Sequence, residues 1–362
     1  MNDVSPPTTT SPRPTLTRIA NELGVSAKTV SNAFNHPDQL SAELRERILS
    51  VARRTGYPGP DPLARALRRG RQRMIGVLYD SQLSYAFDDP SAVAFLAGVS
   101  DIVEPATVGL LLVPGHAGSG RNPEAIADTL IDGVIAYSLA EDDPVLAAIR
   151  TRGLPVVTVD QPRLEGVPWV GIDDQAAARQ VARHLVDLGH QTIGVISFGM
   201  NRQPDRTLHC LASLPIQTYQ VSAHRLAGIQ AVLAPLSARG TVFVAHMADS
   251  TEEEGATAAR LLLAKTRDLT ALICLSDRLA IGAAAVATMT GRPIAITGFD
   301  DIPLAALNDP PLTTIRQPHR EKGRLAARQL FQLLEGDRPE ASIQLDAELV
   351  VRASSTFAPG ES

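Results

Sequence analysis

The stretch Leu16-Thr-Arg-Ile-Ala-Asn-Glu-Leu-Gly24-Val-Ser-Ala-Lys-Thr-Val-Ser-Asn-Ala-Phe-Asn35 decides the fold of the N-terminal part of the chain. Apolar residues recur at helical spacing on both sides of Gly24, which predicts two short helices joined by a tight turn. Ala20 is small where the helices meet, Gly24 tolerates positive φ, and Val30 faces the first helix. This pattern predicts a helix-turn-helix. A small helical bundle with a glycine turn is the alternative.

The residues around this stretch extend the helical head. Residues 42–55 have an apolar face at helical spacing, with Ser41 before them as an N-cap and Gly56 after them. Residues 1–73 hold 12 Lys and Arg against 6 Asp and Glu, whereas the whole chain has a net charge of −5. A basic head on an acidic body predicts that the head binds a polyanion; a solvated charged face is the alternative.

The pattern of apolar residues changes at Met74. Short apolar runs such as 75–79, 133–137 and 271–275 alternate with helical patterns of 10–15 residues. This alternation predicts βαβ units and parallel sheets. The strands are too numerous for one open sheet, so two doubly wound lobes are expected, with ligands bound beyond the carboxyl ends of the strands.

The chain is therefore expected to combine an all-α head with an α/β body. The expected parts are a disordered leader (1–14), a helix-turn-helix head (15–60), a linker (61–73), a two-lobed α/β body (74–354) and a tail (355–362).

Composition and missing motifs exclude several classes of protein. A hydrophobic content of 44% and a charged content of 20% are those of a globular protein. No apolar run reaches the length of a membrane span, and the N-terminus has no signal-peptide core. Cys210 and Cys274 form no ligand motif, and the chain has neither a nucleophile elbow nor a zinc-protease motif. We expect a cytoplasmic protein without metal, cofactor or catalytic activity.

Nearly the whole chain resembles the LacI/GalR family of bacterial transcription regulators. The resemblance in the head is carried by Gly24-Val-Ser-Ala-Lys-Thr-Val-Ser-Asn-Ala-Phe-Asn35, Leu40-Ser-Ala-Glu-Leu-Arg-Glu-Arg-Ile48, Gly56-Tyr57 and Ala64-Arg-Ala-Leu67. It implies that the second helix enters the major groove of DNA, with base edges contacted by Ala27, Lys28 and Asn32. It also implies phosphate contacts from Thr15, Ser26, Thr29, Ser31, Asn35 and Ser41.

The linker resembles the hinge helix of that family. The resemblance implies that Leu67 wedges into the minor groove and that Ala64 lets two hinge helices approach closely. The segment Tyr57-Pro-Gly-Pro-Asp61 is one residue longer than the family pattern, so the register of the hinge is open. A plain charged linker is the alternative.

The body resembles the periplasmic-binding-protein-like effector domain of the family. Polar residues at strand ends match effector contacts, and the resemblance assigns this role to Asp80, Ser84, Asp160, Arg225, Ser276 and Asp300. Each residue alone could instead cap a helix or bridge the lobes.

The resulting prediction is a homodimeric repressor on a pseudo-palindromic operator, controlled by a small polar effector such as a sugar or nucleoside. The alternative is a sugar-binding or enzymatic α/β protein that does not bind DNA.

Overall fold

The computed structural model describes residues 15–35, 39–55, 57, 74–80, 84–114, 130–200, 206–215, 217–237 and 242–356. The chain divides into two compact units, Met1–Gln72 and Arg73–Ser362. The predicted leader (1–14) and hinge, with Ala64 and Leu67, lie outside the described residues.

The first unit is the predicted helical head. It contains α1 (Leu16–Leu23), α2 (Ala27–Asn35) and α3 (Ala42–Thr55). Gly24 ends α1 with φ 67°, the left-handed conformation for which a glycine was expected. Ile19, Ala20 and Val30 are buried together with residues of α3 in one apolar cluster. These contacts confirm the predicted packing of the two helices.

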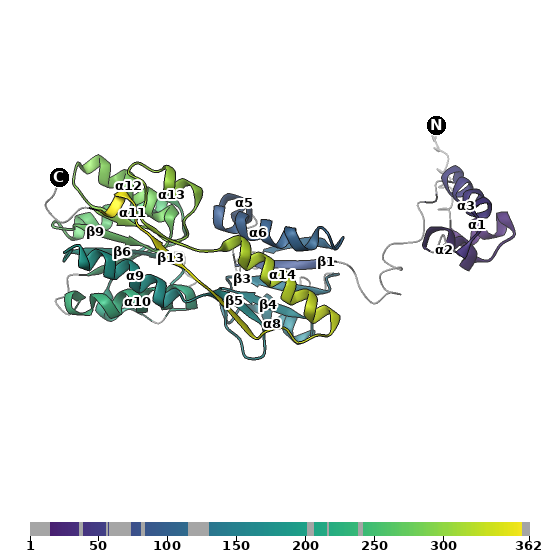
Figure 1. The fold of residues 1–362 in the computed structure, drawn as a ribbon, viewed down its shortest axis with the longest axis horizontal. Coiled ribbons are helices and arrows are strands. Elements are labelled where there is room, and N and C mark those ends of the chain that lie inside the picture. Colours follow the sequence, from purple (N-terminus) through teal and green to yellow (C-terminus); the bar gives the residue numbers. More distant parts are fainter. Residues whose placement is uncertain are drawn as a thin grey trace, which may run out of the picture. The chain divides into compact units, whose positions relative to one another are not determined.

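The second unit contains two lobes (Figure 1). Within the described residues the first lobe has a six-stranded parallel sheet of order β12-β5-β4-β3-β1-β2. Its strands are β1 (Met74–Tyr79), β2 (Gly109–Pro114), β3 (Gly133–Tyr137), β4 (Val156–Val159), β5 (Trp169–Ile172) and β12 (Ser342–Leu345). Its helices are α5 (Tyr85–Asp88), α6 (Pro90–Val103), α8 (Pro144–Thr151) and α14 (His319–Glu335).

The second lobe repeats this design. Its described strands form a five-stranded sheet of order β10-β9-β6-β8-β7, in which only β7 is antiparallel. The strands are β6 (Ile193–Phe198), β7 (Thr207–Cys210), β8 (Phe243–Met247), β9 (Ala271–Cys274) and β10 (Ala295–Thr297). Its helices are α9 (Asp174–Asp187), α10 (Gln220–Ser237), α11 (Glu252–Lys265), α12 (Asp277–Thr290) and α13 (Pro303–Leu307), with short 3₁₀ turns at Leu211–Ser213 and Ala353–Ser355.

Both sheets reverse their direction of winding next to their first strand. Strand β1 lies between β2 and β3, and β6 lies between β8 and β9. A separate apolar cluster covers each face of the second sheet, one containing α9 and α10 and the other α11 and α12. Two doubly wound parallel lobes are thus confirmed, and ligands of such sheets bind beyond the strand ends at the reversal.

Glycines allow the outer helices to cross closely. A Cβ on Gly98 of α6 would lie 1.9 Å from the Arg320 carbonyl oxygen, and one on Gly323 of α14 would lie 2.1 Å from that of Phe95. The same kind of crossing brings α11 against α12. Because these neighbours are backbone atoms, a larger side chain would force the helices apart.

The chain passes between the lobes three times. It crosses from β5 to α9, returns from β11 (Thr314–Arg316) to α14, and crosses again from β12 to β13 (Glu348–Val350). Strands β11 and β13 pair with each other as an antiparallel ribbon (Figure 1). The second of these crossings carries part of the site described below.

Several elements differ from the sequence prediction. Strands β5, β7, β11, β12 and β13 were not predicted. One of the helical patterns of the sequence, at residues 123–131, lies almost wholly outside the described residues. Ser355, placed in the tail by the sequence, is fully buried and hydrogen-bonds to His184, so the body reaches at least that far. No described helix is both long and apolar enough to cross a bilayer. The described part contains no cluster of His, Cys, Asp and Glu suited to a metal ion.

Candidate functional site

The beginning of α2 presents the predicted DNA-reading side chains. Ser26 Oγ accepts a 3.0 Å hydrogen bond from the Thr29 amide, which caps the helix as expected. Ala27 and Lys28 are exposed at this capped end. A capped helix start with an exposed cation can enter a groove and donate to guanine.

The remaining predicted DNA contacts surround this helix. Thr15 and Ser41 are exposed N-cap residues of α1 and α3. Thr15 Oγ1 accepts a hydrogen bond from the backbone amide of Arg18 at 3.4 Å, and Ser41 Oγ accepts one from that of Leu44 at 3.3 Å. Ser31 is half-buried. Asn32 donates through Nδ2 to Gln39 Oε1 at 3.0 Å, so its amide has a partner within the head. The side chain of Asn35 lies outside what the structure describes.

The second candidate site lies at the carboxyl ends of the strands in the body. Ser138 follows β3, Asp160 follows β4 and Asp300 follows β10, with φ angles of 56°, 62° and 120°. Positive φ is costly for residues other than glycine, and such residues cluster where ligands bind. Trp169 Nε1 donates to the Asp160 carbonyl at 2.9 Å, which helps hold that turn.

Arg225 of α10 is buried and fixed on several sides. Its Nε donates to Asp174 Oδ1 at 2.8 Å, its Nη1 donates to the Leu275 carbonyl at 2.7 Å, and its guanidinium lies 3.7 Å from the centre of the Phe299 ring. Burial acts to lower its pKa, but the charges of Asp174 and Asp300 outweigh this and raise it. Arg225 is therefore a fixed positive charge with two of its nitrogens already in use.

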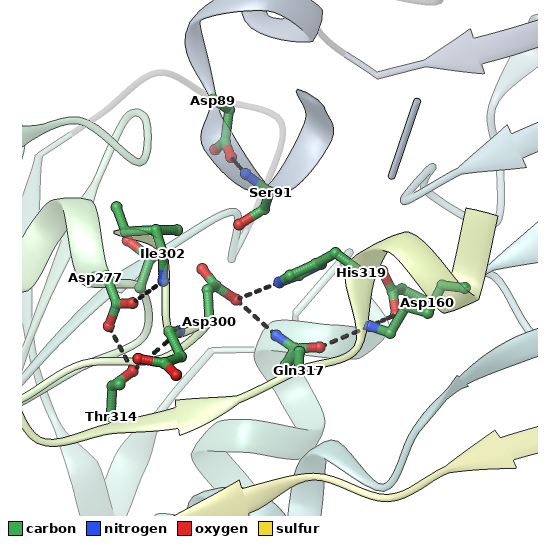
Figure 2. A network of polar contacts seen from close by, with 12 residues as sticks. Asp89, Ser91, Asp160, Asp277, Asp300, Ile302, Thr314, Gln317 and His319 are labelled. Atoms are coloured by element: carbon green, nitrogen blue, oxygen red, sulfur yellow. Dashed lines mark hydrogen bonds and ion pairs between the residues drawn. The ribbon is translucent and has the colours of Figure 1, made fainter. Parts of the chain in front are cut away.

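A chain of hydrogen bonds joins the lobes through Gln317 (Figure 2). Lys322 Nζ of α14 donates to Asp160 Oδ1 at 2.5 Å and to Gln317 Oε1 at 2.6 Å. Gln317 Nε2 in turn donates to Asp300 Oδ1 at 2.6 Å. Gln317 lies in the crossing between β11 and α14, so the chain runs from a strand end of the first lobe to one of the second.

Burial shifts the pKa values of Asp300 and His319. It raises the pKa of Asp300 well above its ordinary value; Arg225 opposes the shift and Asp277 adds to it. His319 Nε2 lies 3.7 Å from Asp300 Oδ1, and burial, aided by Lys322, lowers the pKa of this imidazole well below its ordinary value. Asp300 thus lies beside a neutral imidazole, and an ionised Asp300 gains from a ligand that donates to it.

The other predicted effector residues, Ser276, Asp80 and Ser84, differ in how deeply they are buried. Ser276 is buried, caps α12 and lies 2.7 Å from Ser250 Oγ through its own Oγ. Asp80 is half-buried directly after β1, whereas Ser84 is exposed before α5. Asp160, Arg225 and Asp300 are therefore the predicted residues that the structure brings together, and Ser276 lies in the hydroxyl pair after β9.

Sequence reasoning missed much of this cluster. Asp89 caps α6 and lies 3.9 Å from Arg278 of the other lobe, and Gln317, His319 and Lys322 were assigned no role. The sequence did carry a signal for Lys322, because this lysine lies at helical spacing from apolar residues of the same helix. In the structure its side chain is fully buried. A lysine on the apolar face of a core helix needs a charged partner.

Comparison with known proteins identifies the family. Residues 15–59 match the family described as "Bacterial regulatory proteins, lacI family", and residues 182–355 match "Periplasmic binding protein-like domain". The HTH-type transcriptional regulator IpsA of Corynebacterium glutamicum is 37% identical over 95% of this chain and 98% of its own. An HTH-type transcriptional regulator of Mycobacterium tuberculosis is 39% identical over 93% of this chain and 96% of its own.

The chain belongs to the LacI family. It is accordingly a helix-turn-helix transcriptional regulator with a periplasmic-binding-protein-like body, as the sequence predicted.

Solved structures agree with this assignment. A LacI-family regulator of Corynebacterium glutamicum has a TM-score of 0.69 at 33% identity, covering 94% of this chain and 98% of its own. A structure described as a CelR–cellobiose complex has a TM-score of 0.66 at 28% identity, and the match covers 94% of this chain and 100% of the other. The operator-bound Lac repressor dimer, with a TM-score of 0.73 at 22% identity and coverages of 96% and 100%, supports the fold alone.

Proposed function

We propose that this LacI-family regulator binds a pseudo-palindromic operator as a homodimer and that a small polar effector in its body controls the affinity. The observation that carries the proposal is the convergence of Asp160, Arg225 and Asp300 with Lys322 at the strand ends of both lobes. Charges are rarely buried in such numbers unless they are paired or used. A ligand there contacts both lobes and can bias their arrangement.

The proposed DNA contacts follow the geometry of the head. Ala27 and Lys28 meet base edges, and Asn32 does so after releasing Gln39. The capping side chains of Thr15, Ser26 and Ser41, together with Thr29, Ser31 and Asn35, contact phosphates. Leu67 and Ala64 of the hinge complete the interface at the centre of the operator.

Relatives support a sugar-like effector. The structure described as a CelR–cellobiose complex belongs to a protein 28% identical to this one. Asp300 can accept hydrogen bonds from the hydroxyls of a sugar or nucleoside, and Asp80, Ser84 and Ser276 supply further polar atoms. We propose a cytoplasmic regulator without catalytic activity. A sugar-binding or enzymatic α/β protein is the competing function, and it requires no DNA binding.

A gel-shift assay separates the two functions. The full chain should retard DNA from upstream of its own gene, and binding should weaken steeply with salt, because each neutralised phosphate releases about 0.9 of a counterion. A chain lacking residues 1–73 should lose DNA binding while its body melts as before, since the body is a separate compact unit. Full binding by the shortened chain, or a complex insensitive to salt, contradicts the proposal.

A further inference from the structure

The hydrogen-bond directions in the interlobe chain are fixed by Lys322. An ammonium group can only donate, so the atom of Gln317 that faces it must be the carbonyl oxygen Oε1, at 2.6 Å. The amide nitrogen of Gln317 must then point the other way, where it donates to Asp300 Oδ1 at 2.6 Å. Without Lys322 the amide could turn over and present its oxygen to Asp300.

The two cations of the cluster are already engaged. Lys322 is fully buried and pairs with Asp160 at 2.5 Å. Arg225 pairs with Asp174 at 2.8 Å and covers the ring of Phe299. An anionic ligand would have to compete with these carboxylates for the same donors in a water-poor site.

Asp300 is in the opposite situation. The titratable side chain in ion-pairing contact with Asp300 is that of His319, whose Nε2 lies 3.7 Å from Asp300 Oδ1, and burial keeps this imidazole neutral. One oxygen of Asp300 receives the Gln317 amide. The carboxylate therefore has acceptor capacity left for ligand donors, and in its ionised form it repels an added anion nearby.

We infer that Lys322 is a positioning residue that, through Gln317, fixes the effector site as an acceptor of hydrogen bonds, so that the site takes a neutral polyhydroxylated ligand and rejects phosphorylated or carboxylated analogues. The inference rests on the proposed function, because it assumes that the effector meets Asp300.

The ligand class is tested with a small-molecule extract of the host cells, divided on an anion-exchange resin. Differential scanning fluorimetry of the full chain is run with the flow-through and with the salt-eluted anions. A rise in Tm with the flow-through alone supports the inference. A rise with the eluted anions overturns it and leaves the proposed effector site standing. If neither fraction raises Tm, the proposed function fails, and the inference fails with it.

The role of Lys322 is tested by titrating variants with dilutions of the flow-through fraction. Lys322→Met should need at least tenfold more of the fraction for half of the Tm rise. The matched control is Arg324→Met, which removes a cation of the same helix whose partners are the partly exposed carboxylates of Asp101 and Glu321. This control should respond as the parent does.

A double variant separates positioning from a merely structural role. Lys322→Met leaves Asp160 buried without its cation, so Asp160→Asn is added to restore the balance of charge and, with it, the Tm of the ligand-free protein. Asp160 is itself a proposed effector contact, so the reference is the single variant Asp160→Asn, in which Lys322 still faces Gln317. The Gln317 amide is free to turn in the double variant alone, so the double variant should respond to the flow-through more weakly than this reference. A double variant that responds as Asp160→Asn does would overturn the inference.

Discussion

Replacing Asp300 by asparagine should separate effector binding from stability. Asparagine keeps an oxygen in the place where Asp300 accepts the 2.6 Å bond from Gln317. It removes the charge whose burial raises the pKa of Asp300 well above its ordinary value. A raised pKa in the folded state means that folding is weakened as pH rises and the carboxylate ionises. At neutral pH the Asn variant should therefore melt at the same temperature as the parent or higher.

Effector affinity should fall in the same variant. A hydrogen bond to a charged group contributes about 1.5–3 kcal/mol, which corresponds to a loss of about 10- to 150-fold in affinity. Asp300→Ala is the contrast, because it leaves the Gln317 amide without its acceptor and should cost about 1–3 kcal/mol of stability. Titration calorimetry with effector and scanning calorimetry without it measure the two quantities. An Asn variant with parental effector affinity, or with a clearly lower Tm, would refute the reasoning.

Three further predictions concern the site, the fold and the head. Effector affinity should decrease on acidification, because protonation neutralises Asp300 and turns one of its acceptor oxygens into a donor. Burial raises the pKa of Asp300, and calorimetry at a series of pH values should show this slope in the parent and not in Asp300→Asn. Gly323→Ala should cost about 1–3 kcal/mol of stability, because its Cβ would lie 2.1 Å from the Phe95 carbonyl oxygen; an unchanged Tm would count against the helix crossing. Lys28→Ala should lose about 1–3 kcal/mol of operator affinity and relax one base preference, whereas Ser31→Ala should weaken all sequences evenly. Binding selections with both variants check this, and an unaltered preference in Lys28→Ala would exclude its role in base reading.

Local patterns account for the parts of the fold that the sequence predicted. The helix-turn-helix is visible because Ala20, Gly24 and Val30 lie close together in sequence and also pack or turn there. The parallel lobes are visible because each βαβ unit is local. Strand β12 was missed because it comes from the end of the chain to pair with β5, and a short strand of alternating exposure carries little signal.

The candidate site was harder to predict because its partners are distant in sequence. Asp160 and Asp300 follow apolar strands, so the strand-end rule selects them. Lys322 contacts Asp160 across 162 positions, and no local pattern pairs them. Arg225 was expected to contact an effector, and no pattern in the sequence indicated that its guanidinium also pairs with Asp174. Composition and spacing therefore indicate which residues are polar at strand ends, and only the fold shows which of them still have free capacity.

The place of Gln317 suggests how an effector could act on the arrangement of the lobes. The lobes are also held by Gln161, whose Oε1 accepts from the Val221 amide at 2.7 Å, and this contact lies at the start of α10, away from Asp300 in the sequence. A hydroxyl bound to the remaining acceptor positions of Asp300 should adjoin the Gln317 amide and leave the Gln161 contact in place. Since Gln317 leads directly into α14, which packs against α6, we expect an effector to shift α14 and its lobe about a retained contact. A ligand can bias the lobes only by its difference in affinity between their arrangements, so variants of Gln317 should alter the effector response more than the fold.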